Sequence, residues 1–415
     1  MSVDQIALED LRAQHRRDYD PYNNATIAEH LAEMAQRRRE MPISYSARGN
    51  GTWVLTRYDD IASVLRRNNR GFVSNPNDPD GGNPQGAQKA LIPIELDGDE
   101  HKFYRRLLDP LFSPQRVAAL EDQLRAAAND FIDGFIERGE CDFVEEFAMP
   151  FPGATVMHLM GWPLKDLGRL NEWTGTIQHG IVGVSKEESQ AAQGRAATEM
   201  RAYLLDLIAE RRTNLGDDVT SHVLRAEKDG APLSDDDLFD LLLLLVLAGL
   251  DTVQSTFAQS FMHLGRQPEL WDQMFASPES LEPAIEELLR IAAPAVPTRT
   301  VVHESVQVGE LELPEGERVH FPLAAANRDP AYYPDPDRIV FDRAPKPHLA
   351  FGMGPHRCLG VHLARLELRI GFTELRRRMP RFSLDESRTP TEHLGLAWGV
   401  GNLHLLFEPG PRERS

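Results

Sequence analysis

A glycine-rich segment near the C-terminus combines a cysteine with the backbone freedom needed to present it. Residues 351–360 read FGMGPHRCLG, with Pro355 and three glycines around Cys358. Glycine permits tight or left-handed turns, and proline stiffens them. The periodic run from Val361 to Leu375 predicts a helix, whose N-terminus offers unpaired N–H donors and the positive end of a dipole. Both effects lower a thiol pKa, so we expect a Cys358 thiolate, the form that binds a soft metal or haem iron.

The ordinary alternative for Cys358 is a buried structural cysteine. A zinc site needs about four ligands, and the sequence has no C-x-x-C and no second cysteine nearby, because Cys141 is far away. The pattern F-G-x-G-x-x-x-C-x-G has a chance probability of roughly 3 × 10⁻⁵ in a chain of this composition. One cysteine with a macrocycle is the simpler explanation, and Cys141 is expected to be structural.

An acid beside a hydroxyl interrupts the most apolar part of the chain. Asp251 and Thr252 follow the run from Leu241 to Leu250 within a predicted helix. Such a pair is costly in apolar surroundings without partners. The alternatives are an Asp251 on the outer helix face and a Thr252 that bonds back to its own helix.

Two further pairs of charged side chains have helical spacing. His101 and Arg105 share one helix face at i,i+4, and Glu287 and Arg290 share another at i,i+3. Taken alone, each is best explained as a solvated surface pair that contributes little stability.

The composition is that of an acidic globular chain. The 415 residues carry 45 Lys+Arg against 64 Asp+Glu, a formal charge of −19. This balance argues against nucleic acid and against anionic lipid as partners. The N-terminus lacks an apolar signal segment, and the run from Leu241 to Leu250 is far short of the ~20 residues that span a bilayer. Two cysteines cannot build a disulfide framework, so we expect a cytoplasmic protein with no membrane association.

Helical periodicity dominates the chain, which predicts a mainly α fold with small β-sheets. The longest predicted helix begins after Ser234 and runs to about Arg266, before Gln267-Pro268. Other helices are predicted over 27–39, 59–68, 114–138, 198–212 and 281–291, and the small sheets lie within 43–56 and 299–322. Two segments, 74–94 and 175–194, are predicted to be long loops that act as lids, with variable surface excursions as the alternative.

Taken together, these motifs resemble those of the cytochrome P450 family, the haem-thiolate monooxygenases. The cysteine loop matches the family's ligand signature at every fixed position, Ala248–Thr252 matches (A/G)-G-x-(D/E)-T, and Glu287 to Arg290 matches E-x-x-R. The resemblance covers nearly the whole chain and is nearest in appearance to the camphor-hydroxylase-like branch. It implies one catalytic domain over residues 1–415 with no fused reductase, and haem b between a long distal helix and the cysteine-loop helix.

The resemblance also implies roles for single residues. Cys358 would be the proximal iron ligand, Thr252 would hydrogen-bond the oxygen activated there or its water, and Asp251 would relay protons from solvent. Gly249 would leave room for O₂ against the helix. The cofactor-binding residues implied are His101, Arg105, Ala248, Gly249, Arg299, Phe351, His356, Cys358 and Gly360. The structural residues implied are Glu287, Arg290 and Arg338, the last as the third member of the E-x-x-R motif.

The implied reaction is R–H + O₂ + 2e⁻ + 2H⁺ → R–OH + H₂O. The sequence has no Gly-rich Rossmann fingerprint and no iron–sulfur cysteine set. Electrons from NAD(P)H would therefore arrive through a separate ferredoxin and its reductase. Because such ferredoxins are acidic, this acidic chain needs a local basic patch, for which Arg106, Arg357 and Arg365 are the candidates. We expect a monomer.

The expected substrate is a mid-sized apolar molecule, such as a terpenoid or a small aromatic. The camphor-like branch holds a ketone through a loop tyrosine, and residues 74–94 contain none. The residues predicted to line the pocket are Leu244, Leu247, Ala248, Ala295, Val296, Leu396 and Trp398. An H₂O₂-driven peroxygenase and a non-catalytic haem sensor are the alternative functions, and the pair of Asp251 with Thr252 counts against both.

Overall fold

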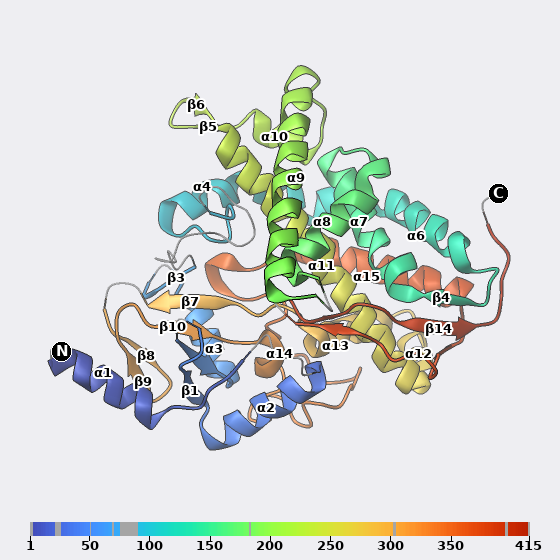
Figure 1. Ribbon diagram of the computed structural model, residues 1–415. Helices are drawn as coiled ribbons and strands as arrows, with labels where there is room; N and C mark the ends of the chain where they lie inside the picture. The colour runs from blue at the N-terminus through green and yellow to red at the C-terminus, as the bar shows by residue number, and fades with distance from the viewer. Residues whose placement is uncertain are drawn as a thin grey trace.

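Helices make up most of the described chain in the computed structural model (Figure 1). The structure describes residues 3–20, 26–49, 51–68, 70–74, 90–181, 184–301, 304–394 and 397–413. The α-helices are α1 (Val3–Gln14), α2 (Ile27–Glu40), α3 (Tyr58–Arg66), α4 (Gly98–Leu108), α5 (Pro114–Ala118), α6 (Glu121–Phe135), α7 (Pro150–Met160), α8 (Leu167–His179), α9 (Lys186–Thr213), α10 (Val219–Leu224), α11 (Asp235–Arg266), α12 (Pro268–Met274), α13 (Leu281–Ala292), α14 (Leu323–Ala326) and α15 (Val361–Arg378). Short 3₁₀ turns are Asp109–Phe112, Leu164–Asp166 and Gly354–His356, and a π turn is Val144–Ala148.

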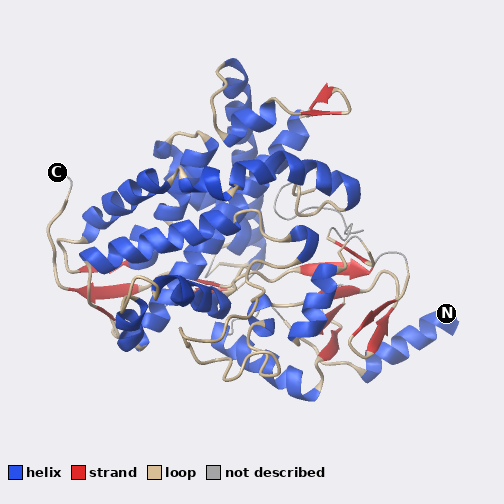
Figure 2. Ribbon diagram, turned by 180° about the vertical axis from the view of Figure 1, so that it is seen from behind, coloured by secondary structure: helices blue, strands red, loops and turns tan. Residues whose placement is uncertain are grey.

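The two larger sheets lie at opposite sides of the molecule, and a separate two-stranded pair lies at the top of the view (Figure 2). The five-stranded sheet has the order β1 (Ile43–Ser46), β2 (Thr52–Leu55), β10 (Arg318–His320), β7 (Thr298–Val301) and β3 (Phe72–Val73). The three-stranded sheet has the order β11 (Phe382–Leu384), β14 (His404–Phe407) and β4 (Glu140–Asp142). The two-stranded pairs are β5 (Glu227–Lys228) with β6 (Ala231–Pro232), β8 (Val306–Val308) with β9 (Leu311–Leu313), and β12 (Glu392–His393) with β13 (Gly399–Val400).

The long helix α11 runs through the centre of the molecule. Its N-terminus is capped by Ser234, whose hydroxyl accepts a hydrogen bond from the Asp237 N–H at 3.1 Å. It ends at Arg266, because Pro268 cannot continue the helix. By length and composition α11 could cross a membrane, but 72% of its most apolar window is buried inside the protein. It is therefore the core helix that the sequence predicts.

Two large clusters of buried apolar residues fill the interior of the protein. The larger core surrounds α11 and includes α6, α7 and α15, with stacked rings such as Phe143 on Phe261 at 4.0 Å. The smaller core lies beneath the five-stranded sheet, around Trp53 and Val319. In that sheet β10 pairs parallel with β2 and antiparallel with β7, which places Arg299 opposite Val319. The register of the sheet thus fixes Arg299 on β7 next to the smaller core.

The structure confirms most predicted elements and corrects several. The helices expected over 27–39, 59–68 and 281–291 correspond to α2, α3 and α13, but the segment 114–138 divides into α5 and α6. The segment 299–322 forms strands as expected, although β9 pairs with β8 while β10 joins the larger sheet. The predicted 74–94 loop falls mainly outside the described residues.

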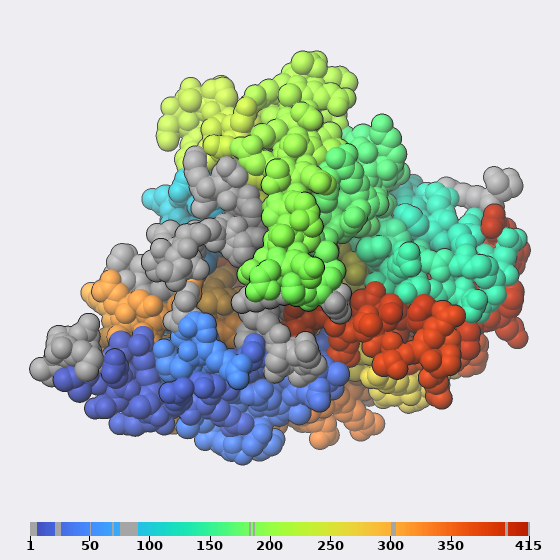
Figure 3. All heavy atoms as spheres, in the orientation of Figure 1, coloured from blue at the N-terminus to red at the C-terminus, as the bar shows by residue number. Residues whose placement is uncertain are grey.

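The predicted loop over 175–194 is wrong. Helix α8 continues to His179, and α9 begins at Lys186 after Ser185. Ser185 and Glu188 form a reciprocal capping box, which starts the helix where the composition indicated a loop. The side chains of α9 form a column down the front of the molecule in the space-filling view (Figure 3).

Candidate active site

The cysteine loop, residues 351–360, is held by a hydrogen bond across its own length. The Cys358 N–H donates to the Phe351 carbonyl at 2.9 Å. Gly354 has a φ of +73°, in the left-handed region that side chains disfavour. A Cβ on Gly354 would also collide with the carbonyl oxygen of Leu65 at the end of α3. Glycine is therefore required at this position, where the loop contacts α3 before it presents Cys358.

Cys358 retains accessible surface, yet dense protein surrounds its sulfur. Burial raises the pKa of the thiol, and the Gly360 N–H and three nearby guanidinium groups only partly oppose this. The expected lowering of the Cys358 pKa by a helix terminus is therefore wrong, because α15 begins only at Val361 and desolvation is the largest effect. A coordinated metal deprotonates a thiol outright, so iron binding itself would produce the thiolate.

Glu287 and Arg290 form a buried pair and not the solvated pair that spacing alone suggests. Arg290 Nε and Nη2 donate to the two Glu287 oxygens at 2.7 and 2.8 Å, and the side chains are 2% and 5% exposed for Arg290 and Glu287. Arg290 also donates to the carbonyls of Asn327 and Pro336 at 2.8 and 2.7 Å. Burial alone would raise the pKa of Glu287, but the hydrogen bonds hold it below its ordinary value.

The prediction that Arg338 completes this motif is wrong. Arg343 Nε donates to the two Glu287 oxygens at 3.2 and 3.3 Å. The Arg338 side chain is exposed, and only its carbonyl contributes, accepting from Arg290 at 3.2 Å. Both arginines lie in one short segment, and its turn brings the Val340 N–H to Glu287 at 3.0 Å, with Arg343 beside it. We call Glu287, Arg290 and Arg343 the glutamate–arginine core.

A second polar group, the cationic cluster, joins α4, β7 and the cysteine loop. Its members are Asn68, Ser74, Asp97, His101, Arg299 and His356. The His101 and His356 rings lie 4.0 Å apart, and His356 Nε2 is 3.1 Å from Asp97 Oδ1. Arg299 Nε donates to Asn68 Oδ1 at 3.0 Å. Burial lowers the pKa of His101 to about 4 and that of Arg299 to about 10.

The donor set of this cluster fits a ligand that carries carboxylates. The Nδ1 atoms of His101 and His356 are buried and have no hydrogen-bond partner among the described residues. One carboxylate, Asp97, faces two imidazoles and the guanidinium of Arg299. Buried donors and a buried cation need acceptors, and arginine and histidine are suited to carboxylate oxygens. Sequence reasoning missed Asn68, Ser74 and Asp97, because none of them has a distinctive spacing relative to the other members of the cluster.

Arg105 does not join the cationic cluster in this structure. Its side chain pairs with Asp109 at 2.8 Å and donates to the Arg357 carbonyl at 2.8 Å. It therefore holds α4 against the cysteine loop. Arg106 and Arg357 are exposed beside it.

Arg365 is engaged within the protein, which removes it from the expected basic patch. Its guanidinium donates to both Glu286 oxygens at 2.6 and 2.7 Å and lies 4.7 Å from the centre of the Phe351 ring. His348 Nε2 is 3.1 Å from the same carboxylate. Burial alone would raise the pKa of Glu286, but these partners hold it at about 2. Arg365 thus fixes Phe351 next to the cysteine.

The middle of α11 is less buried than the segments on either side of it. Ala248 is exposed and Thr252 partly exposed between buried residues. The Thr252 hydroxyl donates to the Ala248 carbonyl at 3.0 Å, so Thr252 does bond back to its own helix. Asp251 is 4% exposed, which rules out the outer-face alternative for this acid.

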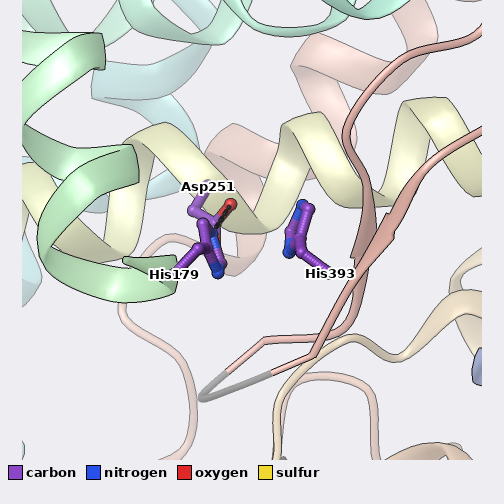
Figure 4. A group of neighbouring side chains, drawn as sticks. All are labelled: His179, Asp251 and His393. Atoms are coloured by element: carbon purple, nitrogen blue, oxygen red, sulfur yellow. Dashed lines mark hydrogen bonds and ion pairs between the residues drawn. The ribbon is translucent and has the colours of Figure 1, made fainter. Parts of the chain in front are cut away.

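Asp251 lies beside two histidines that sequence reasoning missed, with one ligand atom of each of the three residues within 4.8 Å of the others. His179 Nε2 from the end of α8 lies 3.2 Å from Asp251 Oδ1. The His393 ring from β12 lies 3.9 Å from the His179 ring, and burial lowers the pKa of His393 to about 4. The three side chains converge beside α11 (Figure 4). The one signal in the sequence was the need of an acid in an apolar helix for a partner. We call His179, Asp251 and His393 the distal triad.

Gly249 serves helix packing in this structure. A Cβ there would lie 2.6 Å from a methyl group of Val156 on α7. The missing side chain therefore allows α7 and α11 to approach closely, and the expected space for O₂ at Gly249 is not the feature observed.

The residues expected to line a substrate pocket divide into three groups. Ala248 and Ala295 keep accessible surface, and the buried residues are Leu244, Leu247 and Val296. Trp398 is 1% exposed and packs 5.5 Å from the His30 ring. Leu396 lies outside the described residues.

Comparisons with known proteins agree with the cysteine loop and the helical fold. The family model described as "Cytochrome P450" matches residues 187–395 of this chain. The chain is 34% identical to a probable cytochrome P450 127A1 of Sinorhizobium fredii, over 88% of this chain and 87% of that protein. It is also 34% identical to a methyl-branched lipid omega-hydroxylase of Mycobacterium bovis, over 83% of each chain. The crystal structure of Mycobacterium marinum CYP268A2 in complex with pseudoionone matches with a TM-score of 0.84 and 26% identity, over 94% of this chain and 100% of that one.

A mainly helical fold that presents one cysteine from a glycine-rich loop beside a buried E-x-x-R pair defines a haem-thiolate protein. The chain belongs to the cytochrome P450 family. It is a P450 monooxygenase that binds haem iron and uses O₂. The cationic cluster and the cysteine loop have the groups that this cofactor needs, namely the Arg299 guanidinium and the unpaired His101 Nδ1 for its carboxylates and a sulfur for its iron.

Proposed function

We propose that this monooxygenase hydroxylates a mid-sized apolar substrate, such as a terpenoid or a small aromatic, with electrons from a ferredoxin and its reductase. When bound, haem supplies an iron centre that activates O₂ and inserts one oxygen atom into a C–H bond. The single observation that carries the proposal is the buried Asp251 on α11, with its carboxylate on His179 and Thr252 next to it. A sensor has no need of such a proton-carrying group beside its ligand.

On the proximal side, the residues of the cysteine loop, the cationic cluster and Arg105 would position the cofactor. Cys358 would bind the iron, and Phe351, which lies under Arg365, would shield the sulfur from water. His101, Arg299 and His356 would hold the haem carboxylates, and they already lie together in the cationic cluster. Arg105 keeps the loop against α4 through the Arg357 carbonyl.

On the distal side, Asp251 and Thr252 move protons. Oxygen activation consumes two protons for each turnover, and these have to cross a buried helix face. Asp251 takes up a proton on the His179 side, and the Thr252 hydroxyl hydrogen-bonds the water or oxygen next to α11. For this Thr252 has to exchange its bond with the Ala248 carbonyl for one with that ligand.

The substrate proposal rests on the apolar α11 residues and on relatives. Leu244, Leu247 and Ala248 offer methyl groups and no hydrogen-bonding side chain. The named relatives are a methyl-branched lipid hydroxylase and a P450 crystallised with pseudoionone. Both names indicate branched aliphatic chains, which favours a terpenoid over a small aromatic here.

The partner proposal rests on the two exposed arginines beside the cysteine loop. Arg106 and Arg357 give a local positive surface on a chain whose formal charge is −19. An acidic iron–sulfur ferredoxin is attracted to such a surface over about one Debye length, about 8–10 Å. We propose that a single catalytic domain over residues 1–415 works as a monomer in the cytoplasm and takes electrons at this surface.

The ligand role of Cys358 is tested by the carbon monoxide difference spectrum of the reduced holoenzyme. The wild-type protein should give the red-shifted Soret band of thiolate ligation, and Cys358→Ser should lose it. Cys141→Ala is the matched control, because Cys141 is 4% exposed and lies in β4, away from the loop. An unchanged band in Cys358→Ser would refute the assignment.

The substrate class is tested by a spin-state titration followed by turnover. Terpenoids, branched fatty acids, small aromatics and steroids are added to the ferric holoenzyme, and the low-to-high-spin shift is recorded. A compound that shifts the spin state is then incubated with ferredoxin, reductase and NAD(P)H, and the product is analysed by mass spectrometry for one added oxygen atom. Tight binding by steroids alone, or turnover with H₂O₂ alone, would contradict the proposal.

A further inference from the structure

Three potential metal ligands meet at the distal triad from distant parts of the chain. His179 is the last residue of α8, Asp251 lies in the middle of α11, and His393 ends β12. One ligand atom from each lies within 4.8 Å of the others (Figure 4). Gly399 of the neighbouring strand contributes by having no side chain, because a Cβ there would collide with the His393 ring. The backbone thus leaves space for this ring.

Each member of the distal triad has a polar atom without a partner. His179 Nδ1, Asp251 Oδ2 and His393 Nδ1 are buried and have no hydrogen-bond partner among the described residues. A buried polar atom without a partner lowers the stability of the folded chain. Apart from the 3.2 Å contact between His179 Nε2 and Asp251 Oδ1, neither side chain has a hydrogen-bond partner among the described residues. No other group in the described part of the chain therefore competes for these two side chains, and the His393 ring lies 3.9 Å from the His179 ring.

We propose that His179, Asp251 and His393 form a site for one divalent transition-metal ion, with Zn²⁺ as the best fit. Two imidazoles and one carboxylate are the ligand set of three-protein-ligand zinc sites, in which water takes the fourth position. In a tetrahedron with bonds of ~2.1 Å, ligand atoms lie about 3.4 Å apart. The 3.2 Å between His179 Nε2 and Asp251 Oδ1 matches one edge of that tetrahedron. His393, within 4.8 Å, closes the site by a movement of about 1.4 Å.

A metal at this position joins α8, α11 and β12, elements that no covalent bond connects. The ion therefore stabilises the folded chain and fixes the end of α8 against α11. It also occupies the carboxylate of Asp251. If Asp251 carries protons as proposed above, bound Zn²⁺ lowers turnover, but the metal site stands on its geometry alone.

The site is tested by equilibrium dialysis of the haem-loaded protein against micromolar ZnCl₂, with bound metal measured by mass spectrometry. The wild-type protein should bind one Zn²⁺ with higher affinity than any other site. His179→Asn and His393→Asn should each bind it at least about tenfold more weakly. His362→Asn is the matched control, because His362 is an exposed histidine on α15 outside the triad, and this variant should bind Zn²⁺ as the wild type does.

A second measurement uses the wild-type protein alone and does not depend on the folding of variants. Zn²⁺ should raise the apparent melting temperature of the holoenzyme, and a chelator should reverse the rise. The carbon monoxide difference spectrum of each variant reports separately whether the haem site is intact. Equal Zn²⁺ binding by wild type and His393→Asn, or no shift of the melting temperature with Zn²⁺, would overturn the proposal.

Discussion

The glutamate–arginine core and the distal triad differ in how completely their polar groups are satisfied. On the proximal side, Arg290 has its donors divided among a carboxylate and three carbonyls, and Glu287 accepts from three residues. On the distal side, each member of the distal triad keeps an unpaired atom. The proximal side holds a ligand in one geometry, whereas the distal side has to exchange protons, water and substrate. His101 Nδ1 and His356 Nδ1 on the proximal side are also unpaired. Unpaired buried groups therefore lie where the protein has to receive a ligand or a proton, and not in the glutamate–arginine core.

The largest expected effect breaks the proximal side. Glu287→Gln leaves Arg290 charged and buried without its carboxylate, which costs about 3–5 kcal/mol of folding free energy. Glu286→Gln is the matched control one residue away, because the Glu286 side chain is 41% exposed and its ion pairs are partly hydrated, so the loss is expected to be about 1 kcal/mol or less. Urea unfolding of both holoenzymes, followed by the haem Soret band, measures the difference. Equal losses of folding free energy in the two variants would show that the glutamate–arginine core contributes no more stability than the partly exposed ion pairs of Glu286.

On the proximal side the sequence located the cysteine loop and the E-x-x-R pair, but it misassigned Arg105, Arg338 and Arg365. The cysteine loop and the E-x-x-R pair are local patterns, in which spacing along the chain fixes the geometry. The sequence assigned the third arginine to Arg338 and not to Arg343, because the choice between them depends on a turn that brings Val340 to Glu287. Neither propensity nor periodicity encodes that turn.

The distal side was predictable only in part. Ser234 and Pro268 mark α11 correctly, and the polar pair in its apolar run was recognised. His179 and His393 were not, because they reach Asp251 from elements 72 residues before it and from the far C-terminal strand. Contacts of that sequence separation depend on the packing of whole helices. The capping box at Ser185 was readable, but the Gly and Ser content of the segment favoured a loop.

The second prediction breaks the distal side and leaves the fold intact. Asp251→Asn should lower the rate of product formation about 100-fold, the lower end of what a positioned proton-transfer group contributes. The substrate spin-shift titration should be unchanged, since Asp251 is buried and is not part of the proposed apolar lining. Asp236→Asn is the matched control, with the same chemical change near the start of the same helix and an ion pair to Arg201 at 3.1 Å.

A solvent isotope effect separates proton transfer from a structural fault at Asp251. If Asp251 carries the proton, the ratio of rates in H₂O and D₂O should rise in Asp251→Asn, because proton delivery becomes rate-limiting. A rate loss with an unchanged isotope effect, or with a weakened spin shift, would assign Asp251 a positioning role only.

The smallest expected effect is a change in folding stability that is absent at neutral pH and grows in acid. It tests whether acid destabilises the five-stranded sheet before it destabilises the proximal or the distal side. His320 on β10 belongs to neither side, and burial, then the charge of His30, lowers its pKa to about 4. The unfolded chain takes up a proton near pH 6.5 and the folded chain only near pH 4, so stability falls as the pH drops through this window, by up to ~1.4 kcal/mol per pH unit. His320→Gln should flatten this slope in denaturant unfolding measured from pH 7 to pH 4, and His362→Asn, at an exposed position, should not. If both variants leave the slope unchanged, acid acts first on the two sides of the site, where His101 and His393 are buried with equally low pKa values.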